Sequence, residues 1–368
     1  MADIQGATPP VRPPRATSRP EAGAVRGNGQ LKLTVKDFKT DQEVRWCPGC
    51  GDYVILAAVQ SFLPELGIPR ERIVFISGIG CSSRFPYYVN TYGMHSIHGR
   101  APAIATGLSV SRPDLSVWVV TGDGDALSIG GNHLIHALRR NVNLKILLFN
   151  NRIYGLTKGQ YSPTSELGKI TKSTPVGSAD SPFNPLSLAL GADATFVART
   201  IDSDRKHLQS VLRAAADHSG SAFIEIYQNC NIFNDGAFDT LKDPQTRDDF
   251  LIRLEHGQPI TFGADGQWCV VHPPGAFGLE VARTAETPAD HVLVHDATVP
   301  EPAYAFALSR LPNLDLRHTP IGVFRKVSRP SYDDLVRDQI ALAEEKRTRT
   351  PEEELAALLN SGDTWSIH

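Results

Sequence analysis

Two short polar motifs in the chain could hold a metal ion and a phosphate group. The first is Gly-Asp-Gly-Asp at residues 122–125, and the second is Asn-Asn at residues 150–151. Asp123 offers a carboxylate oxygen and Asn151 an amide oxygen. Mg²⁺ takes such hard oxygen ligands sparingly and completes its shell with water and substrate phosphates. Because the two glycines let the backbone turn sharply and approach a phosphate, the motifs together suit a magnesium diphosphate.

Both motifs need a scaffold that brings them together, and the surrounding pattern predicts one. Residues 117–120 and 144–149 are short apolar runs, and a helical stretch covers residues 127–140 between them. Short buried strands with a helix between them imply a parallel sheet. Ligands of such sheets bind at the carboxyl ends of the strands, where Asp123 and Asn151 both fall. Either motif alone is more simply a tight turn, but the two together favour cofactor binding.

Four of the five cysteines lie next to predicted elements of the same sheet. Cys47 and Cys50 form a C-x-x-C pair, and Cys81 and Cys230 each follow a predicted strand. Four thiolates around one point suit a 4Fe–4S cluster or a structural Zn²⁺. A C-x-x-C pair also marks redox motifs, and the other two cysteines could be small buried side chains instead. Cys269 stands outside the pattern and is expected to be structural.

The composition excludes several classes of protein. The chain has 368 residues, 41% hydrophobic and 21% charged, which is ordinary for a globular protein. Its net charge of −3 gives no reason to expect nucleic acid or an anionic membrane as a partner. No apolar run reaches the roughly 18 residues of a transmembrane helix, and the N-terminus lacks the apolar core of a signal peptide. Five cysteines are too few for a disulfide scaffold. We therefore expect a cytoplasmic protein.

The chain divides into three predicted segments. Residues 1–30 are rich in Pro, Ala, Gly and Arg, and we expect a disordered tail because they cannot bury enough apolar surface. Strands and helices alternate within residues 31–238, which predicts one α/β domain with a doubly wound parallel sheet. The alternation is lost in residues 239–368, and we expect a C-terminal extension that covers the domain or a partner. Residues 161–181 form a long polar loop, and such loops are often functional.

The apolar pattern also locates the individual elements. Strands are expected at residues 73–77, 117–120, 144–149, 194–201 and 222–227. Helices are expected at residues 53–66, 101–111, 127–140, 185–190, 207–218, 333–347 and 351–359.

Taken together, the motifs resemble those of a known family. Gly-Asp-Gly with an Asn-Asn pair at a distance of 151 − 123 = 28 positions resembles the thiamine diphosphate motif. The whole set resembles the β-subunits of the 2-oxoacid:ferredoxin oxidoreductases, in order, over about residues 45–235. It is most similar to the members that act on 2-oxoglutarate, including His-Gly-Arg at residues 98–100 and the stretch at residues 153–160. The matching stretches are C-P-G-C-G at residues 47–51, G-C-S-S at 80–83, Gly-Asp-Gly at 122–124, N-R-I-Y at 151–154, Gly159-Gln160, and Cys230.

The resemblance implies a set of cofactors and the residues that hold them. It implies a thiamine-diphosphate-binding sheet, with the cofactor in a cleft between this chain and an α-subunit. The magnesium ligands would be Asp123, Asn151 and the backbone carbonyl of Ile153. One 4Fe–4S cluster would be ligated by Cys47, Cys50, Cys81 and Cys230. The residues implied in cofactor binding are Gly122, Asp123, Gly124, Asp125, Asn151, Ile153 and Tyr154.

The resemblance further implies a reaction. It is the CoA-dependent oxidative decarboxylation of 2-oxoglutarate to succinyl-CoA and CO₂, with electrons passed through the cluster to ferredoxin. The cofactor carries the hard chemistry, and the family places the glutamate that activates it on the α-subunit, so no catalytic residue is assigned here. The alternatives are action on another 2-oxoacid such as pyruvate, and a non-redox thiamine-dependent lyase. A lyase would need no cysteine cluster, and a zinc-stabilised binding protein would need no magnesium motif.

Two residues are candidates for substrate recognition. The distal carboxylate of 2-oxoglutarate is costly to desolvate without a cationic partner. Arg100 lies just before a predicted helix, and its guanidinium could meet that carboxylate with two hydrogen bonds. It could equally form an interface ion pair or bind the diphosphate or coenzyme A. His98 is the second candidate, and Lys172 in the polar loop is a reserve. His95 and His133 are the other titratable residues near the motifs, and His133 is more simply a packed or capping side chain.

Overall fold

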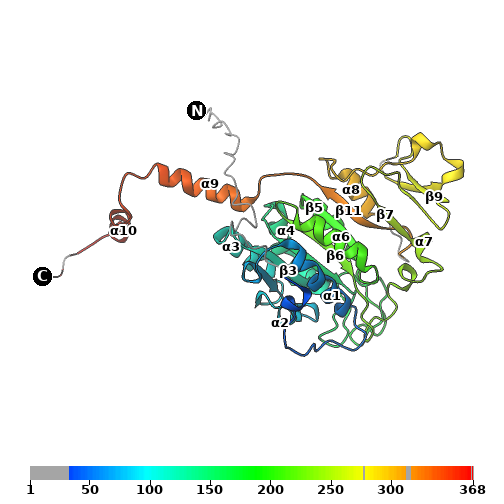
Figure 1. Ribbon diagram of the computed structural model, residues 1–368, viewed down its shortest axis with the longest axis horizontal. Coiled ribbons are helices and arrows are strands. Elements are labelled where there is room, and N and C mark those ends of the chain that lie inside the picture. The colour runs from blue at the N-terminus through cyan, green and yellow to red at the C-terminus, as the bar shows by residue number, and fades with distance from the viewer. Residues whose placement is uncertain (1–32, 277, 312–315, 366, 368) are drawn as a thin grey trace.

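A mostly parallel sheet of eight strands forms the centre of the molecule (Figure 1). The structure is a computed structural model that describes residues 33–276, 278–311, 316–365 and 367. The predicted disordered tail at residues 1–30 lies outside these residues. The strands of the main sheet are β1 (Ile73–Ser77), β2 (Tyr92–His95), β3 (Ser116–Gly122), β4 (Lys145–Asn150), β5 (Phe196–Ile201), β6 (Ala222–Tyr227), β7 (Leu251–Leu254) and β11 (Thr319–Lys326).

The strand order explains why the central strands are apolar along their whole length. The order is β2-β1-β3-β4-β6-β5-β11-β7, and every neighbouring pair is parallel except β5 and β11. Strands β1, β4, β5 and β6 are buried at every position. Parallel strands of this kind are covered on both faces, so apolar side chains point both ways.

Helices cover both faces of the sheet. On one face, α1 (Asp52–Phe62) and α6 (Arg205–Ala216) pack together against the core that contains Phe75 and Trp118. On the other face, α3 (Ala101–Ser111), α4 (Gly131–Arg139), α5 (Pro185–Gly191) and α8 (Ala303–Ser309) pack against a second core. The predicted doubly wound α/β sheet is therefore confirmed.

Most predicted elements in the first 230 residues exist, and their ends differ by a few residues. The predicted helix at residues 127–140 is interrupted, because Asp125–Ile129 is a π-helix that ends at Gly130 before α4 begins. Strand β2 was not predicted, since all four of its residues are exposed and it lies at the sheet edge. The remaining short elements are η1 (Val35–Phe38), η2 (Leu63–Leu66), η3 (Arg70–Arg72), η4 (Ser82–Arg84), α2 (Phe85–Tyr88), η6 (Asp239–Leu241), α7 (Arg247–Phe250), η7 (Thr284–Glu286) and η8 (Ala289–His291).

The segment after residue 238 contributes to the main sheet and forms a smaller one. Strands β7 and β11 lie side by side at one edge of the main sheet. Between them in sequence, a three-stranded antiparallel sheet is built from β8 (Thr261–Phe262), β9 (Trp268–Val271) and β10 (Glu280–Arg283). The division of the chain at residue 238 stays a prediction.

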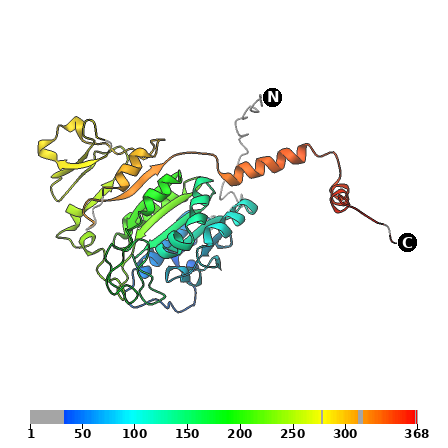
Figure 2. The same ribbon diagram turned by 180° about the vertical axis from the view of Figure 1, so that it is seen from behind.

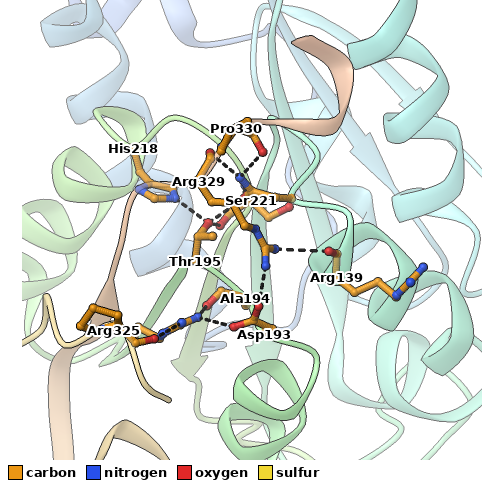
Figure 3. Close-up of polar contacts among 11 residues, drawn as sticks. Arg139, Asp193, Ala194, Thr195, His218, Ser221, Arg325, Arg329 and Pro330 are labelled. Atoms are coloured by element: carbon orange, nitrogen blue, oxygen red, sulfur yellow. Dashed lines mark hydrogen bonds and ion pairs between the residues drawn. The ribbon is translucent and has the colours of Figure 1, made fainter. Parts of the chain in front are cut away.

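The chain after β11 is fastened to the body by a polar network (Figure 3). The Arg329 guanidinium pairs with Asp193 at 2.5 Å and donates to the Arg139 carbonyl at 3.2 Å. The Asn141 amide donates to the carbonyls of Arg329 and Pro330 at 2.9 and 3.2 Å. These contacts fix the point from which the C-terminal helices depart.

Beyond this network, two helices project away from the body (Figures 1 and 2). They are α9 (Tyr332–Glu345) and α10 (Pro351–Leu359), close to the predicted positions. Side chains on both helices are exposed, among them Leu342 and Leu358. Among the residues described, none of the helices combines the length and apolar character that crossing a membrane requires.

Candidate cofactor site

A cavity of about 610 Å³ opens at the carboxyl ends of β1, β3 and β4. This is where ligands of doubly wound sheets bind, and it was the predicted position of the site. The cavity brings together nine of the predicted site residues. They are Gly122, Asp123, Gly124, Asp125, Asn151, Ile153, Tyr154, Cys81 and His98.

Asp123 is a buried carboxylate that no cation neutralises. It directly follows β3 and is 2% exposed. Burial raises the pKa of Asp123 to about 6, although the hydroxyls of Ser162 and Thr164 lower it by hydrogen bonding. These hydroxyls donate to the same oxygen, Oδ2, at 2.5 and 2.6 Å. In the described part of the chain, no Lys, Arg or His side chain pairs with Asp123, so the site fits a bound cation.

The Asn-Asn motif forms a tight turn that faces Asp123. The Asn151 amide oxygen accepts a hydrogen bond from the backbone N–H of Ile153 at 3.2 Å. Between them, Arg152 has a left-handed backbone with φ of 57°. Ser165 donates to the Arg152 carbonyl at 2.6 Å. The turn therefore holds the side chain of Asn151 and the backbone of Ile153 at the same cavity as Asp123.

Gly124 must be a glycine because Tyr154 lies against it. A Cβ at this position would be 2.2 Å from the Tyr154 ring, well inside van der Waals contact. The Tyr154 hydroxyl donates to the Gly124 carbonyl at 2.9 Å. The two motifs are thus locked to each other at the cavity, which the sequence implied only through their shared sheet edge.

Asp125 organises the other side of the cavity around His98. One of its oxygens accepts from His98 Nδ1 at 2.5 Å and from the backbone N–H groups of Gly99 and Ile79 at 2.7 and 3.1 Å. The other accepts from Thr121 at 2.6 Å. Because Nδ1 is engaged, the second ring nitrogen of His98 is the one available to a ligand.

The other candidate residues named from the sequence lie outside the cavity lining. The Arg100 guanidinium donates to the His98 carbonyl at 2.9 Å and is not part of the cavity lining. Lys172 is exposed in the loop. His95 contacts Ser77 at 3.0 Å, and burial lowers its pKa. His133 is half-buried on α4.

The four predicted cysteine ligands converge next to the cavity. A Cβ built on Gly155 would lie 3.4 Å from Cys81 Sγ and 3.7 Å from Cys230 Sγ. Burial raises the pKa of Cys81 to about 12, and the charges of Asp52, Cys230 and Cys47 add to the shift. The pKa of Cys50 is also raised, by burial and then by the charges of Asp52, Cys230 and Cys81. The four sulfurs are therefore close enough to influence one another.

The four thiols are not gathered around one point closely enough to hold a single metal ion. No group of three or more His, Cys, Asp or Glu side chains within the described residues is placed to hold one metal ion. A zinc ion binds thiolates at about 2.3 Å and needs them tightly gathered, whereas an iron–sulfur cluster occupies the space between more separated thiolates. Gly155 lies beside both Cys81 and Cys230, so a side chain at residue 155 would contact the two sulfurs.

Sequence reasoning missed several residues of the site. Ser162 and Thr164 contact Asp123 from about 40 residues away, and the only signal was the unusual polar loop that contains them. The Gln228 amide donates to Cys50 Sγ at 3.3 Å. Asp52 is 1% exposed, and burial with the nearby charge of Asp202 raises its pKa to about 7. No pattern in the sequence distinguishes these last two from ordinary polar residues.

Known proteins resemble this chain over most of its length. A family model described as the thiamine pyrophosphate enzyme C-terminal TPP-binding domain matches residues 78–226. The 2-oxoglutarate oxidoreductase subunit KorB of Mycobacterium tuberculosis is 66% identical over 334 residues, which cover 90% of this chain and 88% of the relative. Subunit beta of 2-oxoacid:ferredoxin oxidoreductase 1 of Aeropyrum pernix is 46% identical over 201 residues, or 55% of this chain and 63% of the relative.

A solved structure has the same fold. It is the 2-oxoglutarate:ferredoxin oxidoreductase from Magnetococcus marinus with 2-oxoglutarate, coenzyme A and succinyl-CoA bound. The TM-score is 0.71 at 34% sequence identity, and the match covers 90% of this chain and 97% of the other. Sequence and fold therefore point to the same group of proteins.

Proposed function

Because the chain belongs to the β-subunits of the 2-oxoacid:ferredoxin oxidoreductases, we propose that it acts on 2-oxoglutarate together with an α-subunit. The reaction is the CoA-dependent oxidative decarboxylation to succinyl-CoA and CO₂, with the electrons passed to ferredoxin. The identity of 66% to a 2-oxoglutarate oxidoreductase subunit supports this substrate, and the resemblance predicted from the motifs is thereby confirmed at the level of the family.

One observation carries the proposal. Cys81 lines the same cavity as Asp123 and also belongs to the group of four thiols. A cofactor held at Asp123 would therefore lie next to a cluster held by the cysteines, which is what a coupled decarboxylation and electron transfer requires. A non-redox thiamine-dependent lyase would have no use for this adjacency.

The magnesium and diphosphate ends of the cofactor would be held by the two turn motifs. Asp123 supplies the carboxylate, Asn151 the amide oxygen and Ile153 the backbone carbonyl. The uncompensated, buried charge of Asp123 supports this assignment, because burial of an unpaired carboxylate is costly unless a cation binds it. Gly122 lets the backbone approach phosphate oxygens. The Tyr154 ring fills the space beside Gly124, and its hydroxyl donates to the Gly124 carbonyl, while Asp125 accepts from Thr121 just before the turn.

The cluster would be ligated by Cys47, Cys50, Cys81 and Cys230. When bound, the thiazolium of the cofactor supplies the electron sink that allows a 2-oxoacid to lose CO₂, and the cluster accepts electrons. This chain positions the diphosphate through Asp123 and offers the cluster thiolates at the cavity wall. We find no candidate for the activating glutamate among the residues that line the cavity, and we place it on the α-subunit.

His98 is the chain's own titratable group at the cavity. Asp125 fixes its orientation through Nδ1, so that Nε2 is left to accept or donate a hydrogen bond at the substrate. Arg100 supports the same turn by binding the His98 carbonyl. We assign His98 a role in contacting the substrate. We assign Arg100 the role of holding the His98 turn or, after a change of rotamer, of binding the distal carboxylate of 2-oxoglutarate. Lys172 is the reserve for that carboxylate.

The experiment that tests the function uses this chain produced together with its α-subunit. The complex is analysed for thiamine, magnesium and iron, its visible spectrum is recorded, and electron release to ferredoxin is measured with 2-oxoglutarate and with pyruvate. Absorption near about 400 nm separates a cluster from zinc thiolate. Faster turnover of pyruvate would refute the substrate, and a colourless complex with full decarboxylase activity would support the lyase instead.

The assignment of Asp123 has its own test in the same complex. Asp123→Ala should lose most of its thiamine diphosphate while it keeps the visible spectrum, because the thiols are not part of the magnesium site. A normal thiamine diphosphate content in this variant would remove Asp123 from the proposed ligand set.

A further inference from the structure

We propose that a second, smaller cavity in this chain is a binding site for a small oxyanion, a ligand with carboxylate or phosphoryl oxygens. The cavity has a volume of about 180 Å³ and shares no lining residue with the cofactor cavity among the residues described. Asn150 and Thr164 line it, and Thr164 contacts Asp123, so the two cavities are neighbours. The site does not depend on the cofactor assignment.

The walls of this cavity carry an excess of positive charge. Glu225 is fully buried and pairs with Arg199 at 2.7 Å. Glu166 pairs with Lys169 at 2.8 Å. Four positively charged side chains stand against these two carboxylates, so two positive charges are left after the pairs are matched (4 − 2 = 2). The charged side chains that line the cavity, with the lysine bound to its rim, are Arg152, Arg199, Arg310, Lys169, Glu166 and Glu225.

Arg310 and Arg152 form no close ion pair among the residues that the structure describes. Arg310 is exposed at the cavity, and no side chain in the described part of the chain pairs with its guanidinium. The Arg152 guanidinium lies over the Phe238 ring at 5.2 Å, hydrogen-bonds to the Tyr227 side chain, and acts with its charge on the Glu166 carboxylate. A guanidinium offers paired N–H donors that match a carboxylate or a phosphate, so Arg310 can bind an anion without breaking an existing pair.

The back wall is fixed in advance by a buried chain of polar contacts. Glu225 accepts from Arg199 with one oxygen and from the Asn150 amide with the other, each at 2.7 Å. The Arg199 guanidinium also lies over the ring of Tyr227 at 5.1 Å. Because all of these side chains are buried, a ligand does not have to order them when it binds, and preorganised groups bind at lower entropic cost.

The volume limits the size of the ligand. The cavity of about 180 Å³ has room for several non-hydrogen atoms. That suits inorganic phosphate or a dicarboxylate of the size of succinate. An apolar ligand or a cation would be disfavoured by the excess positive charge around the cavity.

The test measures binding by calorimetry in the purified complex of this chain with its α-subunit, saturated with magnesium and thiamine diphosphate. The probes are inorganic phosphate and succinate, each at constant ionic strength set with chloride. Arg310→Gln removes the unpaired guanidinium. Arg310→Lys keeps the positive charge but lacks the paired N–H donors of a guanidinium. Arg112→Gln is the matched control, because Arg112 is an exposed arginine that precedes β3, at the opposite end of the strand from Asp123.

We expect Arg310→Gln to weaken the binding of at least one probe by about tenfold, the size of one lost charge-assisted interaction. The affinity of Arg310→Lys should lie between that of Arg310→Gln and that of the wild type, and Arg112→Gln should bind the probes like the wild type. Binding of phosphate alone identifies a phosphoryl ligand, and binding of succinate alone identifies a dicarboxylate. Equal binding by Arg310→Gln and the wild type, or equal losses in Arg310→Gln and Arg112→Gln, would overturn the site. Because Arg310 is exposed and unpaired, its variants are expected to melt at the wild-type temperature.

Discussion

The hydroxyl of Thr164 lies 2.6 Å from the carboxylate of Asp123, although 41 positions separate them along the chain. The same hydroxyl lies 2.9 Å from the amide oxygen of Asn150. A threonine hydroxyl has one hydrogen, so it can donate to only one of these acceptors at a time. The charged carboxylate is the stronger acceptor, and Thr164 thus holds Asp123 in a fixed orientation.

Removing that hydroxyl should weaken the metal site without unfolding it. Thr164→Val keeps the shape of the side chain but leaves Asp123 with one donor fewer. A hydrogen bond to a charged group is worth about 1.5–3 kcal/mol, and without it the Asp123 carboxylate is no longer held in the orientation in which it would bind the cation. We expect magnesium and thiamine diphosphate to bind about tenfold more weakly in the complex with the α-subunit. Thr164→Ser is the control and should bind normally, and equal binding by both variants would remove Thr164 from the site.

The assignment of the cysteines as cluster ligands can be checked by the visible absorption of variants. Cys47→Ser should lose the visible absorption of the complex, because one of the four proposed cluster ligands is missing. Cys269→Ser should keep it, since Cys269 lies in β9 of the small sheet, away from the other four cysteines. Iron analysis of both variants gives the same comparison independently. If both variants keep the wild-type spectrum, Cys47 is not a ligand.

Arg100 makes a prediction about specificity. Arg100→Met removes the charge that could meet the distal carboxylate of 2-oxoglutarate and leaves pyruvate, which lacks that carboxylate, unaffected. We expect kcat/KM for 2-oxoglutarate to fall by at least about tenfold, with little change for pyruvate, in the complex with the α-subunit. An equal loss for both substrates would mean that Arg100 acts by holding the His98 turn, as its hydrogen bond to the His98 carbonyl suggests.

His218 should make the protein less stable in acid. Burial, and then the charges of Lys145 and Lys326, lower the pKa of His218 to about 3 from an ordinary value of 6.5. The unfolded chain therefore takes up a proton below pH 6.5 that the folded chain refuses until about pH 3. Its contribution to stability is complete above pH 6.5 and is lost progressively as the pH falls toward 3.

A glutamine at this position removes the titration and can still bond to Thr195, whose hydroxyl lies 2.8 Å from His218 Nε2 (Figure 3). The melting temperature of His218→Gln should therefore fall less between pH 7 and pH 5 than that of the wild type. His272→Gln, at an exposed position, should show the wild-type slope. Identical slopes for all three proteins would contradict the assignment.

The predictable part of the site consists of residues that follow strands. Asp123 and Asn151 could be placed together because the carboxyl ends of neighbouring parallel strands meet at one edge, and β3 and β4 are neighbours. Ser162 and Thr164 could not, because their contact with Asp123 depends on the path of a loop that has no periodic pattern. The contact between Asp125 and His98 could not be predicted either, because it depends on a turn before α3.

The strands of the main sheet could also be predicted only in part. Strands β1, β3 and β4 were predicted from apolar runs, and they are buried on both faces. Strand β2 carries no such run because it is exposed at the edge. Strand β11 is buried, but it pairs with β5 from more than 100 positions away, antiparallel within an otherwise parallel region, and contains both a proline and a glycine. A proline and a glycine both argue against a strand from sequence alone.

The late arrival of β11 has a consequence for the newly made chain. Until residues 319–326 emerge from the ribosome, β5 is the outermost strand of the sheet, with one side of its backbone unpaired. The delay after β6 is 326 − 227 = 99 residues, or on the order of 5–20 seconds at ordinary rates of translation. An apolar edge that is exposed for that long can pair with the edge of another nascent chain. Folding yield should therefore depend on the speed of synthesis and on chaperones that occupy the β5 edge during this interval.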